Sequence, residues 1–294
     1  MGDVVPASAT ATAGTTTTPT TTEHHGGPMT TARGLHAQVL ETLGQRIVDG
    51  ELEPGTVVRP ETIADEAGVS RSVVREALRV LQSLGLVEPR QRVGTLVRPT
   101  ASWELLAPTV IRWRGASPAY FAQQRELLEL RLGVEPVAAS LVAARSVTED
   151  PTAGPTDDGP ATDPAGTEPT PAAAVLAAAR DMTDACARDD SRAYLEADVR
   201  FHRALLTGSG NAVFAHFAGT VEALLRTRTS ESRDTITRWT RDAAARHEAV
   251  ALAAVAGDAD AASAAATALL RVTREEFIAE APAAGRQART APTR

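Results

Sequence analysis

The sequence predicts a mainly α-helical protein that consists of two domains. Of its 294 residues, 43% are hydrophobic but only 3% are aromatic, so alanine, leucine and valine must fill the interior. This composition favours packed helices over a β-sandwich. Apolar residues at helical spacing account for most of the chain, and the β-prone runs are confined to residues 86–90 and 94–99. A chain of this length is typical of two domains.

Composition also predicts where the domains begin and end. The first 32 residues are rich in threonine, alanine, glycine and proline and cannot bury enough apolar surface to offset the entropy of ordering. Another segment, 146–171, has six acidic and no basic side chains and is broken by proline, which predicts a disordered insertion. The expected organisation is a disordered tail 1–32, a first domain 33–100, a linker 101–117, a second domain 118–281 that contains the insertion 146–171, and a disordered tail 282–294.

The chain is expected to be a cytoplasmic protein without a membrane span. No apolar run reaches the roughly 18 residues that cross a bilayer. The single cysteine, Cys186, cannot form an internal disulfide, which suits a reducing compartment. The formal net charge of -7 argues against non-specific binding of nucleic acid by the whole surface.

The first domain is predicted to contain three helices and a hairpin. The helices are expected at residues 34–49, 61–67 and 71–84, and a turn with a short extended piece separates the first two. Gly68 suits the end of the second helix, and Ser70 caps the third. The two β-prone runs that follow form the hairpin. This order of elements is that of a winged helix-turn-helix.

Arginine is concentrated in this part of the chain. Residues 68–98 hold six arginines against two glutamates, although the whole chain is acidic. Arg71 and Arg75 lie in the first turns of the third helix, and recognition helices present such N-terminal residues to base edges. The hydroxyl group of Ser70 and the helix N-terminus favour contact with phosphate. The hairpin tip carries two more arginines. We therefore predict that this edge binds DNA.

The stretch "VSRSVVREALRVLQSLGLVEPRQRVGTLV", residues 69–97, resembles the DNA-binding half of the GntR family of bacterial transcription regulators. The resemblance covers about residues 34–99 and implies that Gly94 of the wing touches DNA as well. Members usually begin the second helix with a Leu-Pro-Ser-Glu-like stretch, whereas this chain reads "VVRPETIA", so Arg59 or Glu61 would replace that contact. The candidate DNA-binding residues are Arg59, Ser70, Arg71, Ser72, Arg75, Arg79, Arg90, Arg92 and Gly94.

The second domain is predicted to be a bundle of about six helices. The first runs over residues 118–145, and the others fill 172–281 with short breaks, which is typical of a bundle. Arg131 lies near the apolar stripe of the first helix and must reach solvent or find an anionic partner. The residues expected to form that stripe are Leu127, Leu130, Val134, Val137 and Leu141. In the linker, Trp103 and Trp113 are expected to anchor the chain against a helix.

The segment "DVRFH" places two potential metal ligands on one helical face. Asp198 and His202 are four residues apart, and a carboxylate and an imidazole in this relation can chelate a divalent metal. The same pair is often a hydrogen-bonded surface pair without metal. His247 is a third candidate ligand from another helix, while the phenylalanines beside His216 suggest that it packs.

Three segments resemble the FCD effector-binding domain of the FadR subfamily of GntR regulators: "LELRLGVEP", "DVRFHRALLTGSGN" and "RHEAVALAAVAGDADAA". The resemblance covers about residues 118–280 apart from the insertion. It implies that Asp198, His202 and His247 hold a divalent metal, most simply Zn²⁺, and that Arg131 joins them in binding a carboxylate effector. Leu269 stands where the family has its last histidine, and three protein ligands can hold Zn²⁺ when water or an effector oxygen completes the shell. The linker and this missing histidine further resemble the galactonate-responsive, sugar-acid branch.

Three functions are compatible with these features. We expect a homodimeric regulator, in most such proteins a repressor, that binds operator DNA and a small carboxylate or sugar acid. The first alternative is a metal-dependent enzyme that uses Asp198, His202 and His247, but no side chain is placed as an evident general base. The second is an architectural DNA-binding protein without an effector, against which the polar groups on the apolar helices argue.

Overall fold

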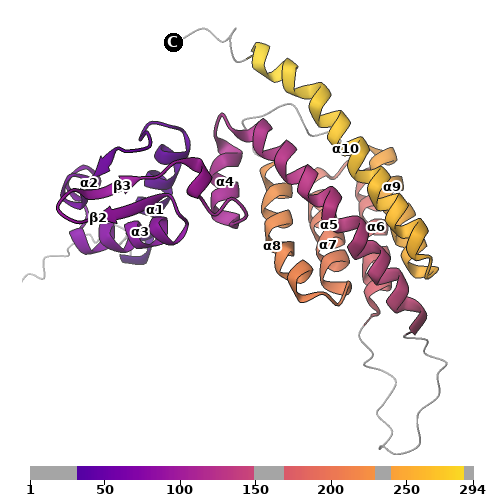
Figure 1. The fold of residues 1–294 in the computed structure, drawn as a ribbon. Helices are drawn as coiled ribbons and strands as arrows, with labels where there is room; N and C mark the ends of the chain where they lie inside the picture. Colours follow the sequence, from indigo (N-terminus) through magenta and orange to yellow (C-terminus); the bar gives the residue numbers. More distant parts are fainter. Residues whose placement is uncertain (1–31, 149–168, 229–239, 288–294) are drawn as a thin grey trace, which may run out of the picture.

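The computed structural model describes residues 32–148, 169–228 and 240–287. The tail 1–31, most of the acidic insertion and residues 288–294 lie outside the described residues, so the disorder expected for them stays a prediction. Within the described ranges the chain forms two bodies joined by a short helix (Figure 1). The mainly α fold expected from the sequence is confirmed, with strands in the first body alone among the described parts.

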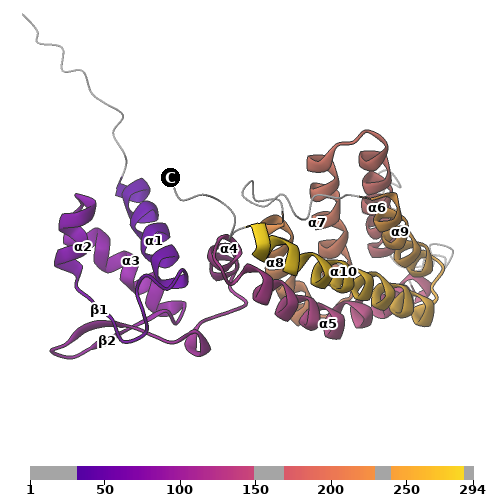
Figure 2. The ribbon, with the colours of Figure 1, turned by 90° about the horizontal axis from the view of Figure 1, so that it is seen from above.

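The first body is a winged helix-turn-helix, as expected. Its helices are α1 (Ala32–Val48), α2 (Pro60–Ala67) and α3 (Arg71–Ser83), and its strands are β1 (Val57–Val58), β2 (Val87–Arg90) and β3 (Gly94–Val97). The strands form an antiparallel sheet of order β1-β3-β2. The sequence predicted the β2–β3 hairpin, which extends beyond the helices in Figure 2. It did not predict that the short extended piece, β1, pairs with β3.

The core of the first body explains which face of α3 is left free. Val39, Leu43 and Ile47 of α1 recur every four residues and are nearly inaccessible to solvent. They belong to one apolar cluster with the buried side of α3, which includes Val74 and Leu81. Because this stripe faces inward, the arginine side of α3 faces solvent.

The second body is an all-helical bundle. Its helices are α5 (Tyr120–Thr148), α6 (Pro171–Ala187), α7 (Ser191–Gly208), α8 (Ala212–Thr227), α9 (Arg241–Val255) and α10 (Ala259–Gln287). Helix α5 packs along α10, α6 packs against α7 and α9, and α7 packs against α8 (Figures 1 and 2). The last helix continues to Gln287, so residues 282–287, which we expected to belong to a tail, are helical.

The buried face of α5 differs from the stripe expected from the sequence. Leu130 is 36% exposed and Val137 is 48% exposed, although both were expected in the core. The face that is buried carries Leu127, as expected, together with small and charged residues, among them Ala138, Arg131 and Glu135. Alanine allows the close approach of neighbouring helices, and the two charged side chains are buried because they pair with each other. The expected stripe was therefore right for Leu127 and wrong for Leu130 and Val137.

The expected linker contains a helix that is packed against both bodies. After a turn of 3-10 helix, η1 (Thr100–Ser102), α4 (Pro108–Ala116) packs against α8 and contacts α1 and α5. Trp113 is buried in the apolar cluster of the first body, and its Nε1 donates to Glu41 Oε2 of α1 over 2.6 Å. Ile111 of α4 is buried with Leu127 and Leu224 of the bundle. The expected anchoring of Trp113 against a helix is confirmed.

Two glycines allow α4 to approach its neighbours closely. A Cβ atom at Gly44 of α1 would lie 2.4 Å from the ring of Trp113. A Cβ atom at Gly115 of α4 would lie 2.4 Å from Cγ2 of Thr227, the last residue of α8. Since real Cβ atoms do not approach other atoms this closely, both helix contacts depend on glycine.

Candidate functional site

The candidate DNA-binding face is formed by the start of α3 and by the hairpin. Ser70 has the extended backbone of a helix N-cap, and its hydroxyl oxygen accepts a hydrogen bond from the backbone N–H of Val73 over 3.4 Å. The same oxygen lies 2.8 Å from the hydroxyl oxygen of Ser72. Arg71 and Arg75 are exposed on the next two turns. The structure therefore brings the hydroxyl groups and guanidinium groups of this helix end together on one solvent-facing surface.

The arginines of this face differ in their intramolecular partners. Arg79 pairs with Glu76 one turn earlier on α3, and Arg90 Nε lies 2.6 Å from Glu88 Oε1. Arg59, Arg71 and Arg92 are exposed, and the described residues offer them no ion pair. A positively charged side chain without an intramolecular partner is free to meet phosphate or a base edge.

The hairpin tip has a backbone that the sequence could not specify. Arg92 adopts a left-handed conformation with φ 63°, and Gly94 has φ 125°. A Cβ atom at position 94 would lie 2.9 Å from Cγ1 of Val57, so the pairing of β3 with β1 also requires glycine there. The tip thereby exposes Arg90 and Arg92 on one short turn.

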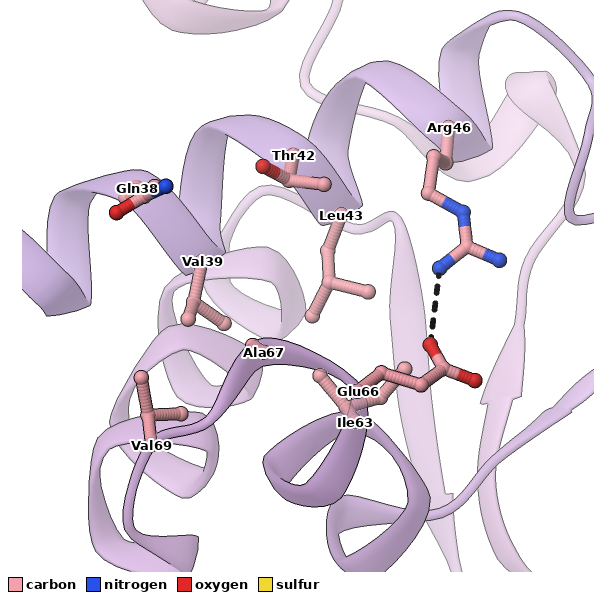
Figure 3. Close-up of a pocket in the computed structure, with 9 residues that line it drawn as sticks. All are labelled: Gln38, Val39, Thr42, Leu43, Arg46, Ile63, Glu66, Ala67 and Val69. Atoms are coloured by element: carbon pink, nitrogen blue, oxygen red, sulfur yellow. Dashed lines mark ion pairs between the residues drawn. The ribbon is translucent and has the colours of Figure 1, made fainter.

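A separate pocket of about 400 Å³ lies between α1 and α2 (Figure 3). It is lined by Gln38, Val39, Thr42, Leu43, Arg46, Ile63, Glu66, Ala67 and Val69. Its only charged lining groups pair with each other, since Arg46 Nη1 lies 3.6 Å from Glu66 Oε2. The pocket therefore offers no unpaired charge to an acidic ligand.

In the bundle, the structure brings together the three expected metal ligands from α7 and α9. Asp198, His202 and His247 are all buried, and one potential ligand atom from each lies within 4.8 Å of the other two. Asp198 Oδ1 lies 3.2 Å from His202 Nε2 and 3.3 Å from His247 Nε2. That buried oxygen accepts no well-formed hydrogen bond in the part of the chain that the structure describes. A buried carboxylate oxygen without such a bond is costly unless a cation binds it.

The other nitrogen of each histidine has an oxygen partner. His202 Nδ1 lies 2.9 Å from Glu135 Oε2, and His247 Nδ1 lies 2.7 Å from the carbonyl oxygen of Ala243. When Nδ1 carries the proton and donates it to these oxygens, Nε2 of both rings presents a lone pair toward Asp198 Oδ1. Oxygen partners of this kind fix the tautomer and orientation of histidines that bind metals. The residues present thus fit a divalent metal, and imidazole with carboxylate suits Zn²⁺.

Glu135 is a member of this site that the sequence analysis missed. Arg131 Nε donates to Glu135 Oε1 over 2.6 Å, and Arg131 Nη2 lies 3.3 Å from Glu135 Oε2. Arg131 Nη2 also lies 2.9 Å from His202 Nε2, so the guanidinium contacts the ligand cluster directly and would have to release this nitrogen when a metal binds. The spacing of four residues between Arg131 and Glu135 was a usable signal, because such pairs meet on a helix face.

Neighbouring basic side chains keep the buried carboxyl groups of Glu135 and Asp198 ionised. Burial opposes ionisation of Glu135, but the charges of Arg131 and His202 outweigh it and lower the pKa of Glu135 to about 2. Burial likewise opposes ionisation of Asp198, and the proximity of His202 and His247 holds its pKa well below the usual range. For His202, burial favours the neutral ring, yet Glu135 and Asp198 raise its pKa. The cluster is therefore a set of interdependent charges.

The cavity beside the cluster is small and has one apolar wall. It has a volume of about 40 Å³, room for about one or two waters rather than for an organic acid. Arg131, Asp198, His202 and His247 all line it, as does Leu269 of α10, which is 3% exposed. Leu269 therefore does lie beside the cluster, where a fourth ligand would be placed. An organic ligand would require side chains around the cavity to move.

The fold and these two sites define a class of protein: a DNA-binding regulator with a helical ligand-binding domain. Residues 35–97 match the family described as bacterial regulatory proteins of the gntR family, and residues 166–272 match the FCD domain. The matches together span more than half of the chain, and the chain belongs to the GntR family of transcription regulators that carry an FCD domain. The FCD match begins after α5, so Arg131 and Glu135 lie outside the matched range. As a member of a regulator family, the protein is not an enzyme.

Curated relatives belong to the same class. The chain is 28% identical over 245 residues to the uncharacterized HTH-type transcriptional regulator YieP of Escherichia coli (strain K12). The aligned region covers 83% of this chain and 95% of that relative. It is 26% identical over 193 residues to the galactonate operon transcriptional repressor of the same strain, and the aligned region covers 64% of this chain and 73% of the repressor. Among solved structures, that of Lar, described as controlling the expression of the Listeria monocytogenes agr system, matches with a TM-score of 0.52 and 16% sequence identity. The match covers 83% of this chain and 96% of the other chain, and it supports the fold alone.

The described residues contain no candidate membrane span. None of the helices in these ranges combines the length and the apolar character that a bilayer span requires.

Proposed function

We propose that the protein is a homodimeric repressor that a small organic acid or sugar acid releases from operator DNA. The observation that carries this proposal is the buried cluster of Asp198, His202 and His247, with Arg131 and Glu135 behind it. A purely architectural DNA-binding protein has no need of such a cluster, and the buried Oδ1 of Asp198, which accepts no well-formed hydrogen bond among the described residues, is unfavourable unless a cation binds it. The relative that represses a galactonate operon supports a sugar acid as effector. Because its target is operator DNA, we place the protein in the cytoplasm.

The proposed DNA contacts follow from the exposed face of the first body. Arg71 and Arg75 would read base edges in the major groove from the start of α3. Arg59, Ser70 and Ser72 would hold phosphates beside them, because hydroxyl groups and a helix N-terminus suit an anion. At the wing, Arg90, Arg92 and Gly94 would approach the adjacent groove or backbone. Arg79 would join them only after releasing Glu76.

The proposed metal is Zn²⁺, held by Asp198 Oδ1, His202 Nε2 and His247 Nε2. When bound, it would supply a Lewis-acidic position for an oxygen of the effector. Glu135 and the Ala243 carbonyl would orient the two imidazole rings, and Leu269 would leave one side of the site without a protein ligand. An open side of this kind suits a site whose purpose is to accept a small molecule.

Arg131 was expected to bind the effector carboxylate, and its environment refines that expectation. Its guanidinium group lines the cavity, but its Nε and one terminal nitrogen already face Glu135. An effector carboxylate would share Arg131 with Glu135 rather than meet an unused guanidinium group. We propose that Arg131 contributes positive charge and positioning to the site, and that it does not supply a free two-pronged clamp.

The proposed dimer contact is the apolar groove between the linker, α5 and α8. Its cavity of about 770 Å³ is lined mainly by apolar side chains, including Leu106, Leu130, Val134, Val213 and Phe217. Leu106 is 46% exposed and Val213 is 74% exposed, which is unfavourable for a monomer in water. We propose that a second copy covers this face, because paired subunits place two recognition helices on a pseudo-palindromic operator.

A thermal-shift screen of the full chain tests this proposal. The purified protein would be heated with sugar acids and short carboxylates, with added Zn²⁺ or with a chelator. An acid at about 100 times its Kd should stabilise the fold by about 2.7 kcal/mol. His247→Gln should remove a shift that depends on Zn²⁺, whereas His36→Gln, a histidine of α1 outside the cluster and outside the apolar groove, should leave it unchanged. If no acid shifted the wild-type protein, the sensor part of the proposal would be wrong.

A further inference from the structure

We infer that Arg228, with Arg246 beside it, forms a second anion-binding position in the same cavity, and that the effector is therefore a small acid with two anionic groups. This inference rests on the proposed function and deepens it by naming the class of effector. Arg228 directly follows α8, and Arg246 lies on α9 next to the metal ligand His247. Both arginines line the cavity that Asp198, His202 and His247 also line.

Among the described residues, the guanidinium group of Arg228 has no acidic partner. Its Nε atom is buried and makes no hydrogen bond, and the residues that the structure describes give it no ion pair. Arg226, two residues earlier, contrasts with it, because Glu196 and Glu222 both pair with Arg226. A partly buried cation that lines a polar cavity without a partner is unfavourable by itself and favourable once an anion binds.

Arg246 pairs with one glutamate and has a buried N–H group that donates no hydrogen bond to the described residues. Its Nη2 donates to Glu276 of α10 over 3.1 Å, while its Nε is buried and makes no hydrogen bond. Both Arg228 and Arg246 act on Tyr194, which lines the same cavity. Burial and Asp198 raise the pKa of Tyr194, and the two arginine charges oppose this rise. Both guanidinium groups thus line the cavity that Tyr194 also lines.

Charge balance indicates how many anionic groups the site accepts. Glu135 balances Arg131, and Glu276 balances Arg246. Asp198 balances one of the two charges of a divalent cation held with neutral His202 and His247. One charge of the cation and the charge of Arg228 remain. A ligand that neutralises both carries two negative charges. One would face the cation held by Asp198 and the histidines, and the other would face Arg228.

The position of Arg228 also suggests how binding there would reach the DNA-binding domain. Arg228 follows Thr227, whose methyl group packs against Gly115 of α4. The hydroxyl oxygen of Thr227 accepts a hydrogen bond from Gln124 Nε2 of α5 over 2.9 Å. Since α4 holds Trp113 in the first body, a shift of Arg228 toward a bound anion would act on the joint between the two bodies.

Isothermal titration of the Zn²⁺-loaded full-length protein tests the inference. The ligands are two acids with one anionic group, galactonate and gluconate, and two with two such groups, galactarate and 6-phosphogluconate. These arms separate a second carboxylate from a phosphate. We expect at least one doubly anionic acid to bind about tenfold or more tightly than either singly anionic acid, because a charge-assisted contact contributes about 1.5–3 kcal/mol. Arg228→Gln should remove this preference.

Controls make the outcomes distinct. Arg271→Gln removes an exposed arginine next to Leu270 of the cavity wall and should preserve the preference. Zn²⁺ content and thermal midpoint of Arg228→Gln should match those of wild type, which separates a lost contact from a lost fold. Equal affinities for all four acids, or an unchanged preference in Arg228→Gln, would overturn the inference while the proposed function stood. Wild-type protein that binds none of the four acids would overturn the inference, and it would overturn the proposed function as well if no acid of the thermal-shift screen bound.

Discussion

Arg131 and Glu135 lie one turn apart on α5 and form a fully buried ion pair, with Arg131 Nε 2.6 Å from Glu135 Oε1. The second carboxylate oxygen of Glu135 lies 2.9 Å from Nδ1 of His202. One glutamate thus joins the arginine to the candidate metal ligands. Glu135 supports the site from behind, and Arg131 is held in place by Glu135 before any ligand arrives.

Replacing Glu135 by glutamine should weaken metal binding. The amide keeps the size of the side chain but loses the charge that orients His202 and pairs with Arg131. Loss of such an oxygen partner typically lowers metal affinity about 10- to 100-fold. Competition titration with a chromogenic Zn²⁺ chelator measures this change. Glu129→Gln, an exposed glutamate of the same helix, is the control. Unchanged Zn²⁺ affinity in Glu135→Gln would separate Glu135 from the site.

The same pair should make stability depend on pH. The pKa of Glu135 is lowered from its ordinary 4.5 to about 2 in the folded chain. A lowered carboxyl pKa stabilises the folded state fully above the unfolded pKa, and this contribution is lost as pH falls from about 4.5 toward 2. Urea unfolding of metal-free protein should therefore show a decline over this range that is shallower in Glu135→Gln. Equal slopes in both proteins would contradict the assignment.

Zn²⁺ should stabilise the wild-type protein through Asp198, His202 and His247. A cation that binds the folded chain alone raises its stability by mass action. We expect the thermal midpoint to rise with Zn²⁺ and fall again with a chelator, and metal analysis after dialysis to give one ion per chain. Asp198→Asn should lose both effects. If Asp198→Asn retained one Zn²⁺ per chain, the metal would lie elsewhere.

Arg71→Ala should weaken operator binding without changing fold or assembly. A bidentate contact with a base contributes about 1–3 kcal/mol, so affinity should fall about 5- to 150-fold. Fluorescence anisotropy with operator DNA selected from a random library provides the measurement. Arg192→Ala, an exposed arginine at the start of α7, is the matched control. Full affinity in Arg71→Ala would remove α3 from the recognition surface.

Leu130→Glu should convert a dimer into monomers. The side chain is 36% exposed and lines the apolar groove between α5 and α8, where a buried carboxylate would be unfavourable. Analytical ultracentrifugation should give the monomer mass for this variant and the dimer mass for wild type. Leu252→Glu, at a residue 51% exposed on α9 and outside the groove, should stay dimeric. A dimeric Leu130→Glu protein would place the interface on another face.

Gly115→Ala should alter the coupling between effector and operator. The added Cβ would lie 2.4 Å from the methyl group of Thr227 and push α4 away from α8. We expect the ratio of operator affinities with and without effector, typically about 5- to 150-fold in coupled proteins, to change while effector affinity changes little. Thr227→Ser removes that methyl group, so adding it to Gly115→Ala should partly restore the ratio. An unchanged ratio in Gly115→Ala would show that this contact carries no signal.

Local signals in the sequence were sufficient for the helices and hairpin of the first body and for the pairing of Asp198 with His202. Gly68 and Ser70 marked the boundaries of α2 and α3 because caps are determined by neighbouring residues. Asp198 and His202 could be paired because helical spacing places them on one face. His247 was associated with them through the resemblance to a known family. That the three lie together was visible only in the fold.

The rest depended on contacts between distant parts of the chain. Glu135 was overlooked because a charged residue on an otherwise apolar helix does not reveal whether it is buried. Leu130 and Val137 were placed in the core because large aliphatic side chains are usually buried, and only the fold shows that both are exposed. Arg228 gave no signal at all, since only the folded bundle shows that its Nε is buried without a hydrogen bond to the described residues. Helix α4 looked like a linker because its neighbours are remote in the sequence.

The central claim is that an acid bound beside Asp198, His202 and His247 controls binding of DNA by the first body. The most direct test titrates Zn²⁺-loaded protein with selected operator DNA, with and without the acid that binds most tightly in calorimetry. The account predicts that the acid weakens operator binding by wild-type protein and leaves operator binding by His247→Gln unchanged. If the acid bound the wild-type protein but operator affinity stayed the same, the claim would be contradicted.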